Sequence, residues 1–289
     1  MKTVQVVSTV LTILAACAGV AAAQQRSAEP AVLARAFQHR MWSARVGDTF
    51  EVRVALPAAY RDTTRRFPLV VVLDGDKSFG LARDITDWLE WASEMEPAVV
   101  VGIGYGPGRD WWQLRARDLT QSPDRSAVWG RNWRSPGGAG RFGEFLETEL
   151  LPFLEGAYRL RPGDRVLAGL SFGGLFAWHG LLNRPGLFPK GSAISPALAW
   201  DSARVLAEEA RFAEAHRALG AEVFTAVGLE DDAMVLAPWR ALNREVEARR
   251  YEGLRLTTLE LPGESHVSAW AVGFQRGLRV MLPPRRSAP

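Results

Sequence analysis

A single serine stands in the stretch GLSFG, with one glycine two positions before it and another two positions after it. An apolar run precedes this stretch and a helix-like run follows it, so Ser171 is expected at a sharp turn from a strand into a helix. Such a turn leaves no room for side chains at Gly169 and Gly173, and it lifts the Ser171 hydroxyl above the edge of the sheet. The pattern predicts a nucleophile; a glycine-rich turn capped by a serine is the plainer interpretation.

A serine nucleophile needs a general base, and the chain has four histidines. His39 falls on an early strand, His179 lies on the helix after the serine, and His216 lies in a charged helix. His266 follows the last expected strand, at the same sheet edge as the serine. Elimination and chain order therefore favour His266 as the base.

The third catalytic group and the oxyanion donors are expected from the same chain order. Three acids, Glu230, Asp231 and Asp232, follow the penultimate strand, and one of them would orient the histidine. Asp231 is favoured, with Glu230 as the alternative. The N–H of Phe172, at the start of the helix after the serine, and the N–H of Asp76, in the turn LDGD, are the expected oxyanion donors.

Strand and helix patterns alternate along the chain, which predicts an α/β fold with a mostly parallel sheet covered by helices on both faces. The first two strands, in 39–57, are expected to be antiparallel. Further strands are expected in 67–76, 97–106, 164–171, 190–196, 221–228 and 254–261. Helices are expected in 81–94, 140–158, 201–219 with Asp201 as its cap, 237–250 and 267–282.

Residues 104–138 break this alternation, since they hold Gly, Pro, Arg and Trp without clear periodicity. A loop of this length is usually functional. Arginine supplies charge and planar stacking, and tryptophan supplies flat apolar area, so residues such as Trp112 would suit a bulky, anionic, aromatic ester. The alternative is that these tryptophans anchor the loop to the core.

The first residues resemble an export signal, with a positive start, an apolar stretch and small residues before Gln24. Residues 1–23 are therefore expected to be a signal peptide and 24–289 a single domain, exported to the periplasm or beyond the cell. The stretch LAAC offers the alternative of a lipoprotein anchored through Cys17. No transmembrane segment is expected in the mature chain.

The net charge is +3, and basic and acidic residues are interspersed without a basic block. Nucleic-acid binding would need clustered positive charge, so that function class is not expected. The single cysteine excludes an intrachain disulfide.

Taken together, these motifs resemble the esterase branch of the α/β-hydrolases, the group that contains ferric-enterobactin and ferric-bacillibactin esterases. The resemblance covers roughly residues 36–282 and rests on VVLDGD, VVVGIGYG, RARDLTQS, GLSFGGLFA, SPALAW, VGLEDDAM and GESHVSAW. It implies an α/β-hydrolase fold and a Ser–acid–His esterase that needs no metal or cofactor. It further implies that the acid is the third residue after the strand-ending glycine, which is Asp231, and that Arg117 contacts the substrate.

The expected activity is hydrolysis of a small-molecule carboxylic ester, with a siderophore ester as one candidate substrate. Acyl transfer or peptide hydrolysis by the same groups would need an acceptor or peptide site that no motif indicates. A ligand-binding homologue that has lost its chemistry is disfavoured because Ser171, His266 and the acidic run are all present.

Overall fold

The protein is described by a computed structural model that covers residues 32–125 and 133–285. All described helices and strands belong to the unit Arg35–Pro289. The expected signal peptide, residues 1–23, and the alternative lipid site at Cys17 lie outside the described residues. Of the helices in the described part of the chain, none is long and apolar enough to cross a membrane.

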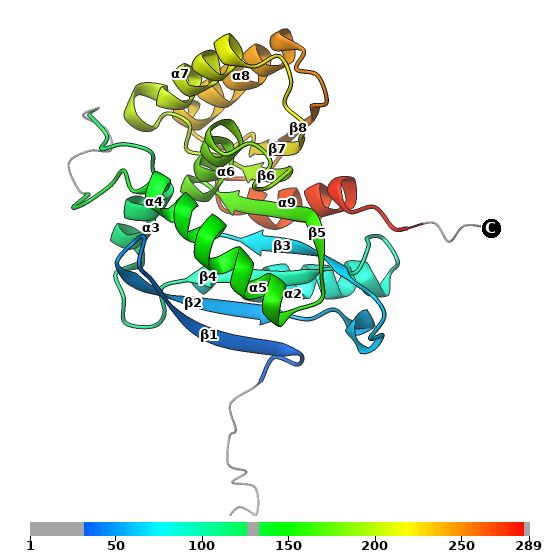
Figure 1. Ribbon diagram of the computed structural model, residues 1–289. Helices are drawn as coiled ribbons and strands as arrows, with labels where there is room; N and C mark the ends of the chain where they lie inside the picture. Colours follow the sequence, from blue (N-terminus) through cyan, green and yellow to red (C-terminus); the bar gives the residue numbers. More distant parts are fainter. Residues whose placement is uncertain (1–31, 126–132, 286–289) are drawn as a thin grey trace, which may run out of the picture. The chain divides into compact units, whose positions relative to one another are not determined.

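Eight strands form one sheet in the order β1-β2-β4-β3-β5-β6-β7-β8 (Figure 1). Strand β1 is antiparallel to β2, and β2 to β4, whereas every other neighbouring pair is parallel. The expected mostly parallel sheet with antiparallel strands near the N-terminus is therefore confirmed. The strands are β1 Ala36–Ser43, β2 Asp48–Ala55, β3 Phe67–Val72, β4 Val99–Gly104, β5 Leu160–Leu170, β6 Lys190–Ile194, β7 Glu222–Gly228 and β8 Arg255–Leu261.

Helices cover both faces of the sheet, as expected. They are the short 3₁₀ helix η1 Ala58–Arg61, α2 Gly75–Trp91, α3 Trp111–Leu119, α4 Ala139–Phe145, the π-helical turn η2 Leu146–Leu150, α5 Leu151–Ala157, α6 Phe172–Asn183, α7 Trp200–Ala215, α8 Ala233–Arg249 and α9 Ala269–Met281. Helices α2 and α9 pack on one face, and α3 to α8 pack on the other (Figure 1).

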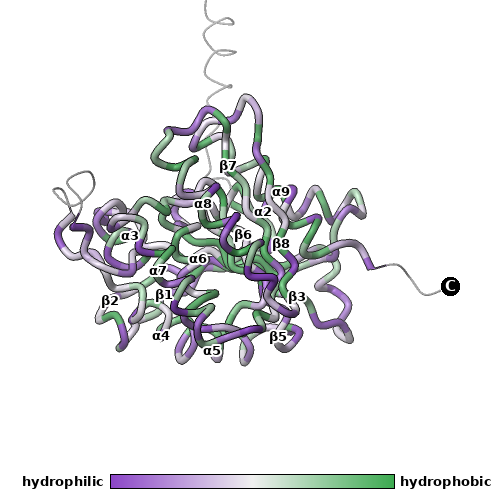
Figure 2. The backbone as a smooth tube through the Cα atoms, turned by 90° about the horizontal axis from the view of Figure 1, so that it is seen from above, coloured by the Kyte–Doolittle hydropathy of each residue, from purple (hydrophilic) through white to green (hydrophobic). Residues whose placement is uncertain are grey.

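Alternation along the central strands fills both cores. In β3, Leu69 and Val71 point into the core beneath α3 to α8, whereas Val70 and Val72 point into the core beneath α2 and α9. All four side chains are fully buried. Figure 2 shows the hydrophobic positions gathered along the central strands. Because both faces of these strands are buried, their sequences are continuous apolar runs.

Helix α2 begins at Gly75, six residues before the expected start, because it packs directly against β4. A Cβ atom at Gly75 would lie 2.7 Å from Gly102 C. The preceding residue, Asp74, has a left-handed backbone (φ 55°), which turns the chain at once from β3 into the helix. The residues of LDGD are typical of a turn, so the sequence pattern does not indicate that a helix begins there.

The expectation of irregular structure throughout 104–138 is wrong in its middle part, where α3 forms. The Asp110 carboxylate accepts a hydrogen bond from Gln113 N (3.3 Å) and caps the helix. The expected cap of α7 is also wrong: Asp201 is left-handed (φ 48°) and its carboxylate instead accepts hydrogen bonds from Ser122 Oγ (2.6 Å) and Arg125 N (3.2 Å).

Candidate active site

Ser171 occupies the turn between β5 and α6 with a backbone conformation that is rare for a residue with a side chain (φ 60°, ψ −115°). Such a conformation costs about 1–3 kcal/mol and persists only when its surroundings hold it. Here Ser171 N donates to Ile194 O (3.0 Å), while Ser171 O accepts from Leu175 N (2.9 Å) and Ala197 N (3.0 Å). The turn is therefore fixed by the next strand and by the first turn of α6.

The glycines around the serine differ in how strictly they are required. A Cβ atom at Gly169 would lie 2.4 Å from Gly173 C, and one at Gly174 would lie 2.9 Å from Pro196 Cβ. A Cβ atom at Gly173 would meet Leu73 Cβ at 3.4 Å, which is ordinary contact. The expected clash is therefore correct for Gly169 but wrong for Gly173.

His266 and Asp231 are in direct contact. His266 Nδ1 lies 2.8 Å from Asp231 Oδ1, and the Asp231 side chain is only 2% exposed. A carboxylate acceptor at Nδ1 selects the tautomer that leaves Nε2 as the lone-pair nitrogen. Glu230 is exposed, and its backbone N–H donates to Glu264 O (3.0 Å). Of the three acids in this run, Glu230, Asp231 and Asp232, Asp231 is the one that the structure places against the histidine.

The other three histidines have partners elsewhere. His39 contacts the Tyr158 hydroxyl (2.6 Å), and His179 Nδ1 contacts Glu208 Oε2 (2.9 Å). His216 ends α7 and stacks on Phe212, with ring centroids 4.3 Å apart.

The loops that carry Ser171, Asp231 and His266 follow β5, β7 and β8, so they share the carboxyl edge of the parallel sheet. Strand β6 lies between β5 and β7, and Ser195 follows it directly. The Ser195 N–H donates to Ala226 O (2.7 Å), and its hydroxyl accepts from Gly228 N (3.4 Å). Ligands of open α/β sheets bind at this edge.

The expected oxyanion donors both lie in the first turn of a helix, the end that favours negative charge. Phe172 is the first residue of α6 and Asp76 the second residue of α2. The Asp76 carboxylate accepts hydrogen bonds from Tyr105 N (2.6 Å) and Gly106 N (3.2 Å), which fasten α2 to the turn after β4, and from Arg53 Nη2 of β2 (3.1 Å).

An aromatic group surrounds the start of α6. Its members, which contact one another at centroid distances of 4.9 to 6.2 Å, are Trp111, Trp112, Trp133, Phe172 and Trp200. Trp112, the expected substrate contact, is 56% exposed. This group could hold a flat apolar ligand beside the serine.

A buried ion pair, not expected from the sequence, lies within this group. Arg115 Nε and Nη2 donate to the two Asp74 carboxylate oxygens at 2.8 and 2.9 Å, and the side chains are 3% and 6% exposed. The guanidinium carbon lies 4.7 Å from the Trp111 ring centroid and 4.8 Å from that of Phe172. No sequence signal connects Asp74 with Arg115, because their contact depends on the packing of α3 over the sheet edge.

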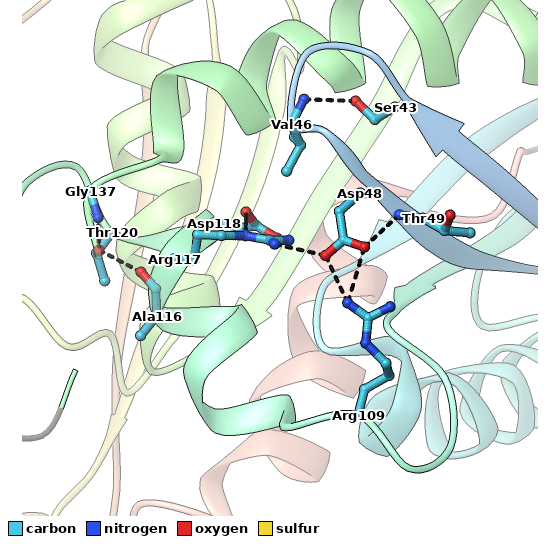
Figure 3. Close-up of polar contacts among 10 residues, drawn as sticks. All are labelled: Ser43, Val46, Asp48, Thr49, Arg109, Ala116, Arg117, Asp118, Thr120 and Gly137. Atoms are coloured by element: carbon cyan, nitrogen blue, oxygen red, sulfur yellow. Dashed lines mark hydrogen bonds and ion pairs between the residues drawn. The ribbon is translucent and has the colours of Figure 1, made fainter. Parts of the chain in front are cut away.

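Arg117, the other expected substrate contact, lies between two carboxylates (Figure 3). Its Nη1 donates to Asp48 Oδ2 (2.7 Å), and its Nε and Nη2 donate to the Asp118 carboxylate (2.7 and 2.8 Å). Arg109 also donates to Asp48 (2.8 Å). The two carboxylates balance the charge of the Arg117 guanidinium. Their contacts with it use three of its five N–H groups.

Comparisons with known proteins extend over most of the chain. The profile of the family described as "Putative esterase" matches residues 43–280. Ferri-bacillibactin esterase BesA of Bacillus subtilis strain 168 is 28% identical over 236 residues, 75% of this chain and 80% of that protein. Two crystal structures are similar: the BES protein from Bacillus cereus (TM-score 0.79, 24% identity, 90% of this chain and 99% of that one) and an IroE-like serine hydrolase from Shewanella oneidensis (TM-score 0.77, 25% identity, 85% and 79%).

We predict that Gly169→Ala destabilises the fold by about 1–3 kcal/mol, because its methyl group would force the β5–α6 crossing apart. Gly180→Ala is the matched control within α6: its Cβ would meet nothing within 4 Å, so a gain of about 0.5–1 kcal/mol is expected. Denaturant unfolding measures both. A Gly169→Ala midpoint at or above that of the wild type would contradict the close approach.

A second prediction concerns Asp48. Burial raises the pKa of Asp48, but the hydrogen bonds from Arg117 and Arg109 together lower it by more, so this pKa lies below its ordinary value. Its contribution to stability is then complete above the unfolded pKa of about 3.9 and is lost as the pH falls through the folded pKa. The stability gap between wild type and Asp48→Asn should shrink as the pH falls from 7 towards 3.

Denaturant unfolding across that pH range measures the gap. Asp84→Asn, which removes an exposed ion pair with Arg83, is the control and should change little at any pH. A gap for Asp48→Asn that stayed constant or widened in acid would contradict the prediction.

Proposed function

The chain belongs to this esterase family of the α/β-hydrolase superfamily and is a carboxylic ester hydrolase, and we propose that Ser171, His266 and Asp231 carry its reaction. The observation that supports this most directly is the 2.8 Å contact between His266 and a buried Asp231, at the sheet edge where the strained Ser171 lies. Ser171 is the nucleophile, His266 the general base, and Asp231 the group that orients the imidazole and stabilises its charged form.

In the first half of the reaction, Ser171 Oγ attacks the ester carbonyl carbon while His266 Nε2 takes the hydroxyl proton. The N–H groups of Phe172 and Asp76 stabilise the negative oxygen of the tetrahedral intermediate. His266 then gives its proton to the leaving alcohol, and an acyl-serine remains. In the second half, His266 activates a water molecule that releases the acid and restores Ser171.

The proposed substrate is a ferric catecholate siderophore ester. BesA is named a ferri-bacillibactin esterase, and two fungal relatives are named siderophore esterases. The exposed Trp112, in the aromatic group at the start of α6, and the guanidinium of Arg117 on the same helix suit flat aromatic rings that carry negative charge. Arg117 and Trp112 are therefore proposed as substrate contacts.

The same proposal includes export of the protein after removal of residues 1–23, which the composition of that stretch supports. The mass of the protein recovered from the producing cells tests it, since a lipid on Cys17 would add the mass of its acyl chains and leave a longer polypeptide.

We predict that Ser171→Ala lowers kcat for ester hydrolysis by about 10⁴-fold or more, because it removes the nucleophile without removing packing. Circular dichroism and the unfolding midpoint should match the wild type, and a fluorophosphonate probe should label the wild type alone. Retention of more than about a tenth of the rate would contradict the assignment of the nucleophile.

Asp231→Asn should lower kcat far more than Glu230→Gln. Loss of the orienting carboxylate selects the wrong histidine tautomer and has cost about 10⁴-fold in a serine protease, whereas Glu230 is exposed. Kinetics of the two variants with one p-nitrophenyl ester provide the comparison. If Glu230→Gln were the more damaging change, the acid would be misassigned and the remaining roles would stand.

Arg117→Ala should lower kcat/KM for an iron-loaded catecholate trilactone more than for p-nitrophenyl butyrate, because only the larger, anionic substrate reaches the arginine. Asp48→Asn is the matched control, since it loosens the same network and keeps the guanidinium. A trilactone that is not hydrolysed would refute the proposed substrate. Equal losses on both substrates, or equal effects of the two variants, would refute the contact.

A further inference from the structure

The Asp74–Arg115 ion pair is costly for a protein to bury. Both side chains are almost fully enclosed, so each charge loses its hydration. A buried ion pair seldom stabilises a fold more than apolar side chains of the same size would, even with bidentate geometry. Here apolar and aromatic groups surround the pair on several sides. Net stabilisation of the fold therefore does not explain the pair, and its position in the structure is the better guide to its role.

The carboxylate partner belongs to the turn that starts α2. Asp74 is left-handed, and its carbonyl oxygen accepts hydrogen bonds from Lys77 N and Ser78 N, both at 2.9 Å. It lies two residues before Asp76, whose N–H is one proposed oxyanion donor. A displacement of the Asp74 backbone would therefore move the start of α2, and with it that donor.

The guanidinium partner reaches the other proposed donor. Arg115 Nη2 donates to Leu170 O (3.3 Å), the carbonyl directly before Ser171. The guanidinium also stacks against the Phe172 ring, whose own backbone N–H is the second oxyanion donor. On the other side, Asp74 Oδ2 lies 3.5 Å from the place that a Cβ atom would take on Gly173. The pair thus contacts Leu170 and Phe172, on either side of the proposed nucleophile, and lies close to Gly173.

We propose that Asp74 and Arg115 are positioning residues that set the distance between the two halves of the oxyanion site, an inference that rests on the proposed function. The two donors follow β3 and β5, which are neighbours in the sheet, and Leu73 N already donates to Ala168 O (3.0 Å). Beyond the ends of these strands, the ladder no longer fixes the spacing. The bidentate pair and the contact with Leu170 fix it there instead.

Both donors must lie about 2.7–3.1 Å from the developing oxyanion, and a displacement of 1 Å can cost about 10²-fold in rate. Arg115→Lys keeps the charge but loses the planar fork, so it cannot hold both Asp74 oxygens and Leu170 O together. Asp74→Asn keeps the size but replaces one acceptor oxygen with an amide donor that faces the guanidinium.

The experiment uses three test variants, Arg115→Lys, Asp74→Asn and the double variant. The control is Arg161→Lys, which alters another largely enclosed ion pair, between Arg161 and Glu96, at the opposite end of β5. For each folded variant, kcat and KM for p-nitrophenyl butyrate are measured, together with the rate of Ser171 labelling by a fluorophosphonate and the unfolding midpoint. The labelling rate is informative because the phosphonyl oxygen also occupies the oxyanion site.

Each single variant is expected to lower kcat and the labelling rate together by about 10²-fold with little change in KM, and the double variant to lose no more than either single one. Arg161→Lys should lower the unfolding midpoint without changing kcat. The inference is overturned if the Arg115 and Asp74 variants also lose only stability, if KM rises while kcat and labelling hold, or if the losses of the two single variants multiply in the double variant. Failure of the proposed function has a different signature, namely a wild type whose Ser171 is not labelled at all.

Discussion

Where β5 ends and α6 begins, the two backbone segments approach so closely that a methyl group on Gly169 would lie 2.4 Å from Gly173 C. A helix can start immediately over a buried strand only if the linking residue takes an unusual conformation, and Ser171 takes it. Asp74 does the same at the end of β3, the neighbouring strand. The sheet edge therefore presents the starts of two helices at the ends of neighbouring strands, each preceded by a residue with a positive φ.

The sequence was sufficient for the parts of this arrangement that depend on local pattern. Apolar runs marked the strands because both faces of the sheet are buried, and chain order then placed Ser171, Asp231 and His266 at one edge. Pattern failed where a distant contact decides the conformation. Helix α2 starts early because it packs on β4, and α3 forms in a stretch whose glycines, proline and tryptophans conceal its helical period.

The side-chain contacts around the turn at Ser171 also depend on residues far apart in the sequence. Asp74 and Arg115 are 41 positions apart, and neither stands in a spacing that suggests a pair. The RARDLTQS motif identifies Arg117 but carries no information about Asp48, which lies 69 positions away at the start of β2. Contacts of this kind arise only once the helices have been packed over the sheet, so residue types alone do not disclose them.

The arrangement in Figure 3 also has a consequence for how the protein opens. Asp48 begins β2, and through Arg109 and Arg117 it joins α3 to the β1–β2 hairpin, at the antiparallel border of the sheet. Local unfolding proceeds in cooperative units joined by such contacts, so α3 and this hairpin should exchange their amide hydrogens as one unit. The helix that carries Trp112 is then held by the antiparallel strands at one border of the sheet, so α3 should open together with that border.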